Sequence, residues 1–287
     1  MGGTYHNDNV YDTDASVGWM IGSYNILGLI RKDSVVCNYL THVNGEPMVL
    51  RRAISQDDDD LIGHEARILA DMQRIDWFKW ESPHYIPMLH RFDADGQVFN
   101  VVEFKSDRHS SPDLFYTLAE IKNISEGEIP IKVIGWLWRR ILGGLIFPHH
   151  EGFINCGITP DSIWIDPASH SVVLMDWYNA SKHQDPPRLI VPKWRLMYPP
   201  EILAKDLPTP ATDICMAAKV MLWAFPGMPP EMKLYFSVLA QDSVRARISD
   251  IDLLLKEWDR VMYDRLNWKR EFVPFEFNPQ INWEWWW

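Results

Sequence analysis

The spacing of hydrophobic residues divides the chain into two regions. Between residues 23 and 104 short runs alternate apolar and polar positions, which is typical of strands, while residues 61–73 place apolar side chains at helical spacing. The hairpins that this pattern predicts join residues 33–40 to 46–53 through Asn44-Gly45, and residues 86–92 to 97–104 through Asp95-Gly96. The first region is therefore predicted to be an antiparallel sheet with one helix.

Helical spacing dominates after residue 105. The longest apolar stretch, residues 132–150, predicts a buried helix in which Gly143-Gly144 would allow close packing. Two short strands and three further helices are predicted at residues 162–165, 171–176, 211–225, 230–240 and 249–263. A strand-rich part followed by a helix-rich part indicates an α+β fold with two lobes.

The composition argues against a nucleic-acid-binding protein, a membrane protein and a disulfide-rich or metal-binding protein. The formal net charge of −11 argues against a nucleic-acid partner, because neutralising phosphates requires clustered Lys and Arg. No apolar run reaches the roughly 18 residues that span a bilayer, and the N-terminus lacks a secretion signal, so we expect a cytoplasmic protein without a membrane partner. The three widely spaced cysteines predict buried thiols rather than a disulfide framework or a metal site.

Several charged residues lie within short sequence motifs that follow one another in a fixed order. Arg51 lies in "MVLRRA", Glu65 in "GHEARIL" and Asp176 in "VVLMDWY", and the stretch "GFINCGITPDSIWID" precedes Asp176. In this order and spacing, over residues 24–263, the sequence resembles the protein kinase superfamily. The resemblance places Arg51 at the third-strand lysine, Glu65 at the helix C glutamate that pairs with it, and Asp176 in the metal-binding DFG triplet.

The resemblance implies how the chain is divided. A mainly β N-lobe with one helix would occupy residues 16–104 and a larger helical C-lobe residues 105–270, with a flexible N-terminus at 1–15 and an aromatic tail at 271–287. Three residues further along match structural positions of this superfamily, namely Glu201 of "YPPE", Asp213 of "ATDICMAAKVM" and Arg247 of "RARISDIDLLL". In the resembled fold Arg247 pairs with Glu201, and Asp213 is buried.

The catalytic loop departs from the pattern of this superfamily. In the frame H-R-D-x-x-x-x-N, the catalytic Asp is replaced by Gly157, the metal-binding Asn by Ser162 and the phosphate-steadying Lys by Thr159. Glycine cannot accept a proton, and the loss of a general base costs on the order of 10²–10⁴ in rate. Asp161 could serve as the base only if the frame were shifted, which would break the match at Pro160. We therefore expect no catalytic residue.

The nucleotide cleft is also incomplete by this resemblance. Residues 29–35 hold no glycine where the superfamily has its phosphate-binding loop, so side chains would obstruct the backbone amides. The cleft residues that remain are Arg51, Glu65, Glu103 of the hinge strand and Asp176. Arg51 with Glu65 could be a residual nucleotide clamp or an ion pair that ties helix to sheet. Asp176 alone is a poor magnesium site, so we expect no cofactor, with ATP and Mg²⁺ as the alternative.

The end of the sequence adds a segment beyond the resembled fold. Residues 272–287 contain three Phe and four Trp side chains, and prolines within this segment disfavour a continuous helix. Aromatic side chains at this density favour burial. The tail either folds back on the second lobe or anchors a protein partner, and it carries no basic residue that would favour an anionic membrane surface.

These observations predict a catalytically inactive protein kinase-like protein, a pseudokinase, that acts as a binding, scaffolding or regulatory module for a protein partner. Two alternatives remain open at this point. One is a weak or atypical ATP-dependent phosphotransferase, and the other is a nucleotide-binding sensor without turnover.

Overall fold

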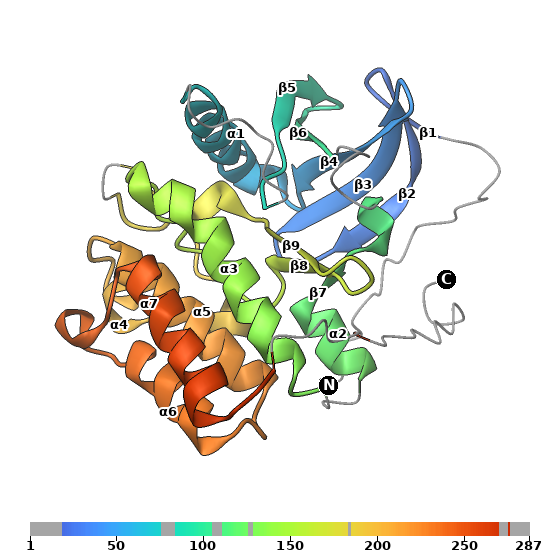
Figure 1. Cartoon of the computed structure of the whole chain (residues 1–287). Coiled ribbons are helices and arrows are strands. Elements are labelled where there is room, and N and C mark those ends of the chain that lie inside the picture. The colour runs from blue at the N-terminus through green and yellow to red at the C-terminus, as the bar shows by residue number, and fades with distance from the viewer. Residues whose placement is uncertain are drawn as a thin grey trace, which may run out of the picture.

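The chain folds into two lobes, a sheet with one helix and a larger bundle of helices (Figure 1). The structure is a computed structural model, and it describes residues 19–75, 84–104, 111–125, 129–182, 185–269 and 275. The N-terminal lobe lies above the helical lobe in this view, and the small strands β8 and β9 lie where the two lobes meet.

The N-terminal lobe is built on a six-stranded antiparallel sheet in the order β1-β2-β3-β4-β6-β5. The strands are β1 (Trp19–Ile21), β2 (Tyr24–Lys32), β3 (Val36–Val43), β4 (Glu46–Ala53), β5 (Met88–Ala94) and β6 (Gln97–Glu103). Both predicted hairpins are confirmed. Asn44 and Gly45 have φ angles of 54° and 87°, and Asp95 and Gly96 have φ angles of 50° and 74°, as two-residue turns of this kind require.

One helix, α1 (Asp59–Gln73), packs on this sheet through an apolar face that includes Leu61, Ile62 and Leu69. It begins two residues before the predicted range, directly after the 3₁₀ turn η1 (Gln56–Asp58). The carboxylates of its first turn lie at the positive end of the helix dipole, which explains why consecutive aspartates are tolerated here.

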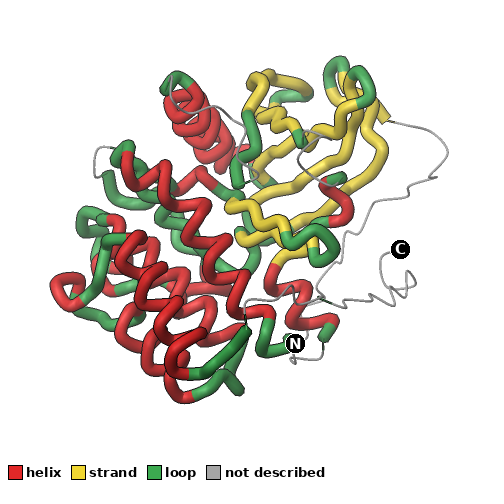
Figure 2. Tube along the Cα trace, in the orientation of Figure 1, coloured by secondary structure: helices red, strands yellow, loops and turns green. Residues whose placement is uncertain are grey.

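The second lobe is mainly helical (Figure 2). Its helices are α2 (Leu118–Ile124), α3 (Val133–His150), α4 (Pro200–Leu203), α5 (Pro210–Ala224), α6 (Pro230–Leu239) and α7 (Ile251–Asp259), which continues as the π-helix Arg260–Arg265. A three-stranded sheet joins β7 (Tyr116–Thr117), β8 (Ile163–Asp166) and β9 (Ser171–Leu174). Shorter 3₁₀ turns are η2 (Pro112–Leu114), η3 (Trp177–Asn179), η4 (Pro192–Met197) and η5 (Val244–Ala246).

One continuous apolar core joins the two lobes, with α3 at its centre. The predicted close approach at Gly143-Gly144 is present, because a Cβ at Gly144 would lie 3.2 Å from Leu174 Cδ1 of β9. A Cβ at Gly143 would lie 2.8 Å from His84 Nε2. Within the described ranges no helix is both long and apolar enough to cross a membrane.

Candidate functional site

Three strands of the N-terminal lobe place polar side chains in one row. Arg51 of β4 is paired with Asn38 of β3 on one side and with Asn100 of β6 on the other. Directly opposed residues of neighbouring strands share a face of the sheet, so these three side chains meet in an otherwise apolar interior. Arg51 Nη1 donates to Asn38 Oδ1 at 2.6 Å, and all three residues are buried.

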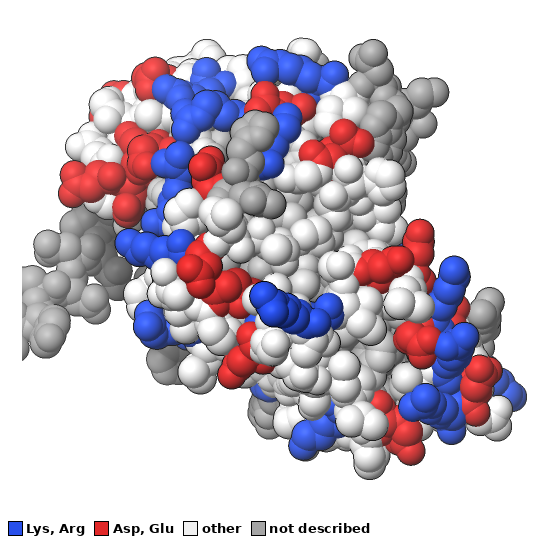
Figure 3. All heavy atoms as spheres, turned by 90° about the vertical axis from the view of Figure 1, so that its left-hand side faces the viewer, with Lys and Arg blue, Asp and Glu red and all other residues white. Residues whose placement is uncertain are grey.

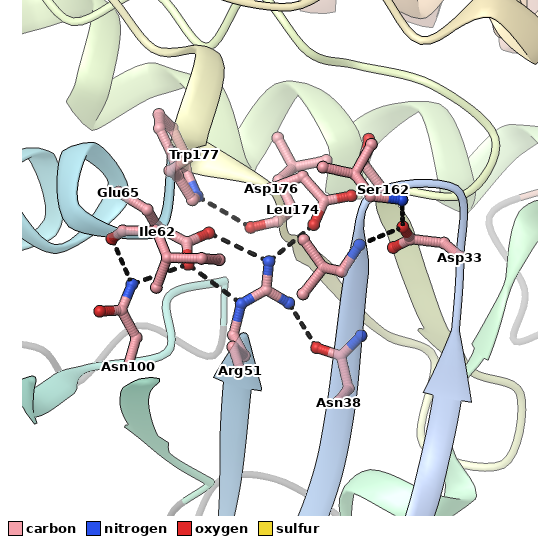
Figure 4. Close-up of polar contacts among 12 residues, drawn as sticks. Asp33, Asn38, Arg51, Ile62, Glu65, Asn100, Ser162, Leu174, Asp176 and Trp177 are labelled. Atoms are coloured by element: carbon pink, nitrogen blue, oxygen red, sulfur yellow. Dashed lines mark hydrogen bonds and ion pairs between the residues drawn. The ribbon is translucent and has the colours of Figure 1, made fainter. Parts of the chain in front are cut away.

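The predicted pair between sheet and helix forms around this row (Figure 4). Arg51 Nε and Nη2 donate to Glu65 Oε2 and Oε1 of α1 at 3.1 and 3.0 Å, a bidentate arrangement. Asn100 Nδ2 donates to Glu65 Oε2 at 3.1 Å and to the Ile62 carbonyl at 2.8 Å. Arg51 therefore ties α1 to the sheet.

Arg51 also holds the carboxylate of the second lobe. Its Nη2 donates to Asp176 Oδ1 at 2.7 Å, and Figure 4 shows the guanidinium between Glu65 and Asp176. Asp176 follows β9 in the left-handed region, with φ 63° and ψ 48°. Burial is the main reason that the pKa of Asp176 is raised to about 7; the charge of Arg51 opposes this shift and the nearby charge of Asp33 contributes to it. A single guanidinium thus contacts two buried carboxylates.

Two further acidic residues of the cleft region have different roles. Asp33 Oδ1 accepts hydrogen bonds from the backbone N–H groups of Val35 and Val36 at 2.6 and 2.8 Å, which fixes the β2–β3 turn that has no glycine. Burial raises the pKa of Asp33, against these two hydrogen bonds. Glu103 is the last residue of β6 and pairs with Met48 of β4. Arg51 pairs with Asn100 instead, so Glu103 does not belong to the row of polar side chains around Arg51. The structure brings Arg51, Glu65 and Asp176 together and leaves Glu103 outside their cluster.

The catalytic-loop positions are filled by residues that bond within the loop. Gly157 N donates to Asn155 Oδ1 at 2.9 Å, and a Cβ at Gly157 would lie 3.3 Å from the Asp176 carbonyl oxygen. Ser162 Oγ accepts from Thr159 N at 2.9 Å and donates to Thr159 O at 3.1 Å. The buried hydroxyl of Ser162 thus closes its own turn.

Asp161, the alternative base considered from the sequence, contacts the 3₁₀ turn η4. Its Oδ2 accepts from Trp194 Nε1 at 2.6 Å and from Lys193 Nζ at 3.1 Å. Both donors belong to η4, so the carboxylate is used to hold this turn against the loop.

The three residues expected to be structural make the contacts that the resemblance implies. Arg247 Nη1 and Nη2 bind Glu201 Oε1 and Oε2 at 2.5 and 3.1 Å, and both side chains are buried. Asp213 of α5 accepts from the backbone N–H groups of Asn155 and Cys156 at 2.7 and 2.8 Å and lies 2.9 Å from His149 Nε2. Asp213 therefore holds the start of the catalytic loop.

A second arginine crosses from the sheet to the helical lobe. The guanidinium carbon of Arg31, near the end of β2, lies 3.9 Å from the ring centroid of Trp164 on β8. Arg31 Nη2 donates to the Phe115 carbonyl at 2.5 Å and lies 3.3 Å from Glu120 Oε2. Phe104, which follows the hinge strand β6, has its ring 6.3 Å from that of Trp164. Arg31 and Trp164 thus fill the space beside the hinge.

The cluster of Arg51, Glu65 and Asp176 borders a small cavity. The cavity next to Arg51, Glu65 and Asp176 measures about 20 Å³, which accommodates about one water molecule. In the described part of the chain no group of three or more His, Cys, Asp or Glu side chains could hold a metal ion. Asp176 is a single carboxylate already bonded to Arg51, so these residues do not fit a magnesium site.

The charge on the surface is mixed. On the face drawn in Figure 3, Lys and Arg side chains are interspersed with Asp and Glu side chains, and an uncharged area lies between them. This face has no broad basic stripe of the kind that tracks a phosphate backbone.

Comparisons with known structures agree with this arrangement of the two lobes. No family model matches the sequence, and no curated protein does either. The solved kinase domain of PknI from Mycobacterium tuberculosis superposes with a TM-score of 0.60 at 15% identity, covering 86% of this chain and 98% of that one. The fold is that of a protein kinase. A second structure of the same domain gives a TM-score of 0.60 at 14% identity, and a double mutant of it gives 0.61 at 15%.

The protein kinase-like fold was therefore predicted correctly, including its small β lobe with one helix and its larger helical lobe. Four residues of the site were not predicted, namely Arg31, Asn38, Asn100 and Trp164. Asn38 and Asn100 could have been recognised as single amides inside the apolar strands "VVCNYL" and "VFNVV", where a buried polar group needs a partner.

Proposed function

We propose that this protein kinase-like chain is a pseudokinase that binds a protein partner and transfers no phosphate. The observation that carries the proposal is that the protein's own side chains occupy the cleft. Arg31 lies over Trp164 beside the hinge, and Arg51 holds Asp176. A nucleotide would have to displace both arginines before it could bind.

The composition of the catalytic loop supports the same proposal. Gly157 provides no base, and Ser162 is bonded to the backbone of Thr159. General-base loss alone costs on the order of 10²–10⁴ in rate, and here a metal ligand is replaced as well. A kinase-like fold without these catalytic groups still presents two lobes and an extensive surface. We assign it the role of binding a protein partner.

Two measurements on the full chain test this proposal. We expect no transfer of labelled phosphate from ATP to a generic protein substrate or to the chain itself. We also expect no rise in melting temperature with millimolar ATP and Mg²⁺, whereas a ligand at 100 times its dissociation constant stabilises by about 2.7 kcal/mol.

The Arg31→Ala variant serves as the comparison in the second measurement. If ATP stabilises this variant and leaves the unmodified chain unchanged, occlusion by Arg31 is the cause. Saturable stabilisation of the unmodified chain without turnover would instead favour a nucleotide sensor, and labelled-phosphate transfer that needs Asp176 would favour an atypical phosphotransferase.

A further inference from the structure

The space beside the hinge has an aromatic floor of fixed position. Trp164 of β8 is buried, and it pairs with Thr117 of β7 in the small sheet of the second lobe. The guanidinium carbon of Arg31 lies 3.9 Å from the centroid of the Trp164 ring, well within the roughly 6 Å over which a cation and an aromatic face attract each other. The floor of this space therefore suits a flat, positively charged group.

Two oxygen acceptors contact the same guanidinium. The Phe115 carbonyl accepts from Arg31 Nη2 at 2.5 Å, and Glu120 Oε2 lies 3.3 Å from that nitrogen. The capping box of α2 holds Glu120 in place, because its Oε2 also accepts from Thr117 N at 2.6 Å. Backbone and helix start thus position both acceptors independently of Arg31.

The charge in these surroundings favours a cation over a phosphate group. Burial lowers the pKa of Arg31, and four acidic residues around it oppose this effect, namely Glu120, Asp33, Asp176 and Asp161. Carboxylates attract a positive charge and repel the negative charge of a phosphate. The electrostatic environment beside the hinge is therefore opposite to the one that a nucleotide requires.

Arg31 itself matches the acceptors of this space incompletely. Its Nε and Nη1 atoms are buried and donate to no acceptor among the described residues. Arg51 differs, because its Nε, Nη1 and Nη2 all donate to side-chain oxygens. Buried donors without acceptors cost free energy, which weakens the hold of the site on Arg31. A planar cation that is not tied to β2 can turn towards the same acceptors with a smaller loss.

We propose that the space beside the hinge is a binding site for the guanidinium or amidinium group of a small molecule, and that Arg31 occupies it in this structure. Trp164 would stack on the planar cation, and the Phe115 carbonyl and Glu120 would accept its N–H groups. This inference rests on the proposed function, since it assigns to the closed cleft a ligand class other than nucleotides.

Chemical complementation of the full-length Arg31→Ala variant tests the site. The substitution removes the guanidinium and the methylene groups that carry it, and ethylguanidinium supplies the same atoms. At millimolar ethylguanidinium and constant ionic strength, we expect a saturable rise in the melting temperature of the variant. The unmodified chain should need an about tenfold higher concentration, because its own Arg31 competes at high effective concentration.

Matched probes separate shape from charge. N-ethylurea is planar but uncharged, and propylammonium is charged but not planar, so each should bind Arg31→Ala about tenfold more weakly than ethylguanidinium. Combining Arg31→Ala with Trp164→Leu should abolish the effect of ethylguanidinium. If Arg31→Ala does not fold alone, ethylguanidinium should raise its refolding yield and N-ethylurea should not.

Several results would overturn the cation site. These are no stabilisation of Arg31→Ala by ethylguanidinium, equal effects of the three probes, equal affinity of the unmodified chain, or undiminished binding after Trp164→Leu. Stabilisation of the unmodified chain by ATP would instead contradict the proposed function. The failure of one idea is therefore distinguishable from the failure of the other.

Discussion

At the scale of single residues, the charge balance around Arg51 determines the chemistry of the cleft. One guanidinium contacts Glu65 and Asp176, and all three side chains are buried. Two carboxylates with one cation leave an excess negative charge in a region of low dielectric, which favours proton uptake. The raised pKa of Asp176 follows first from its burial, while the charge of Arg51 opposes it and the charges of Asp33 and Glu65 add to it.

Stability should therefore depend on pH through Asp176. Its pKa is about 7 in the folded chain and about 3.9 in an unfolded one, so the folded state retains the proton over this interval. The stabilisation is complete below about pH 4 and is lost as the pH rises towards 7. The Asp176→Asn variant should lack this pH-dependent contribution to the free energy of unfolding. Urea unfolding from pH 5 to 8 should show the unmodified chain losing stability relative to the variant as pH rises, and a constant difference would contradict the assignment.

Removal of Arg51 should destabilise the fold strongly. Arg51→Ala leaves the buried carboxylates of Glu65 and Asp176 without their cation, and breaking a buried pair in this way costs about 3–5 kcal/mol. Arg74→Ala is the control, because its ion pair with Asp71 is exposed and worth about 0–1 kcal/mol. The free energies of unfolding can be compared by chemical denaturation, and equal losses in the two variants would show that Arg51 is not a structural centre.

The residues of the cleft were only partly predictable from the sequence. Arg51, Glu65 and Asp176 could be placed because each has a distinctive neighbourhood in a fixed order along the chain. Arg31 and Trp164 lie 133 positions apart in sequence and belong to different lobes, so only the folded chain reveals their contact. Local pattern carries no information about such a pair, because the contact depends on how the lobes meet.

At the scale of elements, helix α5 organises the loop that precedes β8. Asp213 accepts two backbone N–H groups of this loop and contacts His149 at the end of α3. Cys156 of the same loop has a φ of 57°, which a residue with a side chain adopts only when its surroundings hold it there. The buried pair of Glu201 with Arg247 performs a similar function between α4 and η5.

Substitutions at these anchors should impair folding rather than a particular activity. Asp213→Ala leaves two backbone donors without an acceptor, and Arg247→Ala leaves Glu201 buried without its cation, at a cost of about 3–5 kcal/mol for the broken ion pair. Thermal unfolding and the soluble yield of each variant provide the measurement. Normal melting of both variants would mean that these contacts do not hold the lobe together.

Most elements were predicted because their hydrophobic patterns are long. Helix α3 has 18 residues and was located to within one residue at its start. Helix α2 has seven residues and was missed, although Thr117 and Glu120 form a capping box that marks its start. Strand β1 has three residues, which is too short for a period of two to be distinguished from chance.

At the scale of the whole molecule, two buried arginines connect the lobes. Arg31 extends from β2 to the Phe115 carbonyl and Trp164, and Arg51 extends from β4 to Asp176. A continuous apolar core accompanies these bridges. Side chains of the chain itself therefore tie the two lobes together.

The two lobes should consequently unfold together. Calorimetry of the full chain should give one transition whose calorimetric and van't Hoff enthalpies agree. Combining Arg31→Ala with Arg51→Ala should separate the transitions of the lobes. Arg188→Ala is the control, since Arg188 also contacts the N-terminal lobe at Asp60, but through an exposed pair. Two transitions in the unmodified chain would contradict the coupling.

Under the proposed function, the close packing around Gly157 restricts which substitutions could supply a catalytic base. A side chain at this position would begin 3.3 Å from the Asp176 carbonyl oxygen and 3.4 Å from Asn155 Oδ1, so an aspartate introduced there would first crowd its neighbours. The neighbours of such a side chain would have to shift by a few tenths of an ångström to accommodate it. Under the same proposal, Arg31 beside the hinge and Ser162 at the metal-ligand position would have to change as well. A substitution that restores the base would therefore depend on several further changes made together with it.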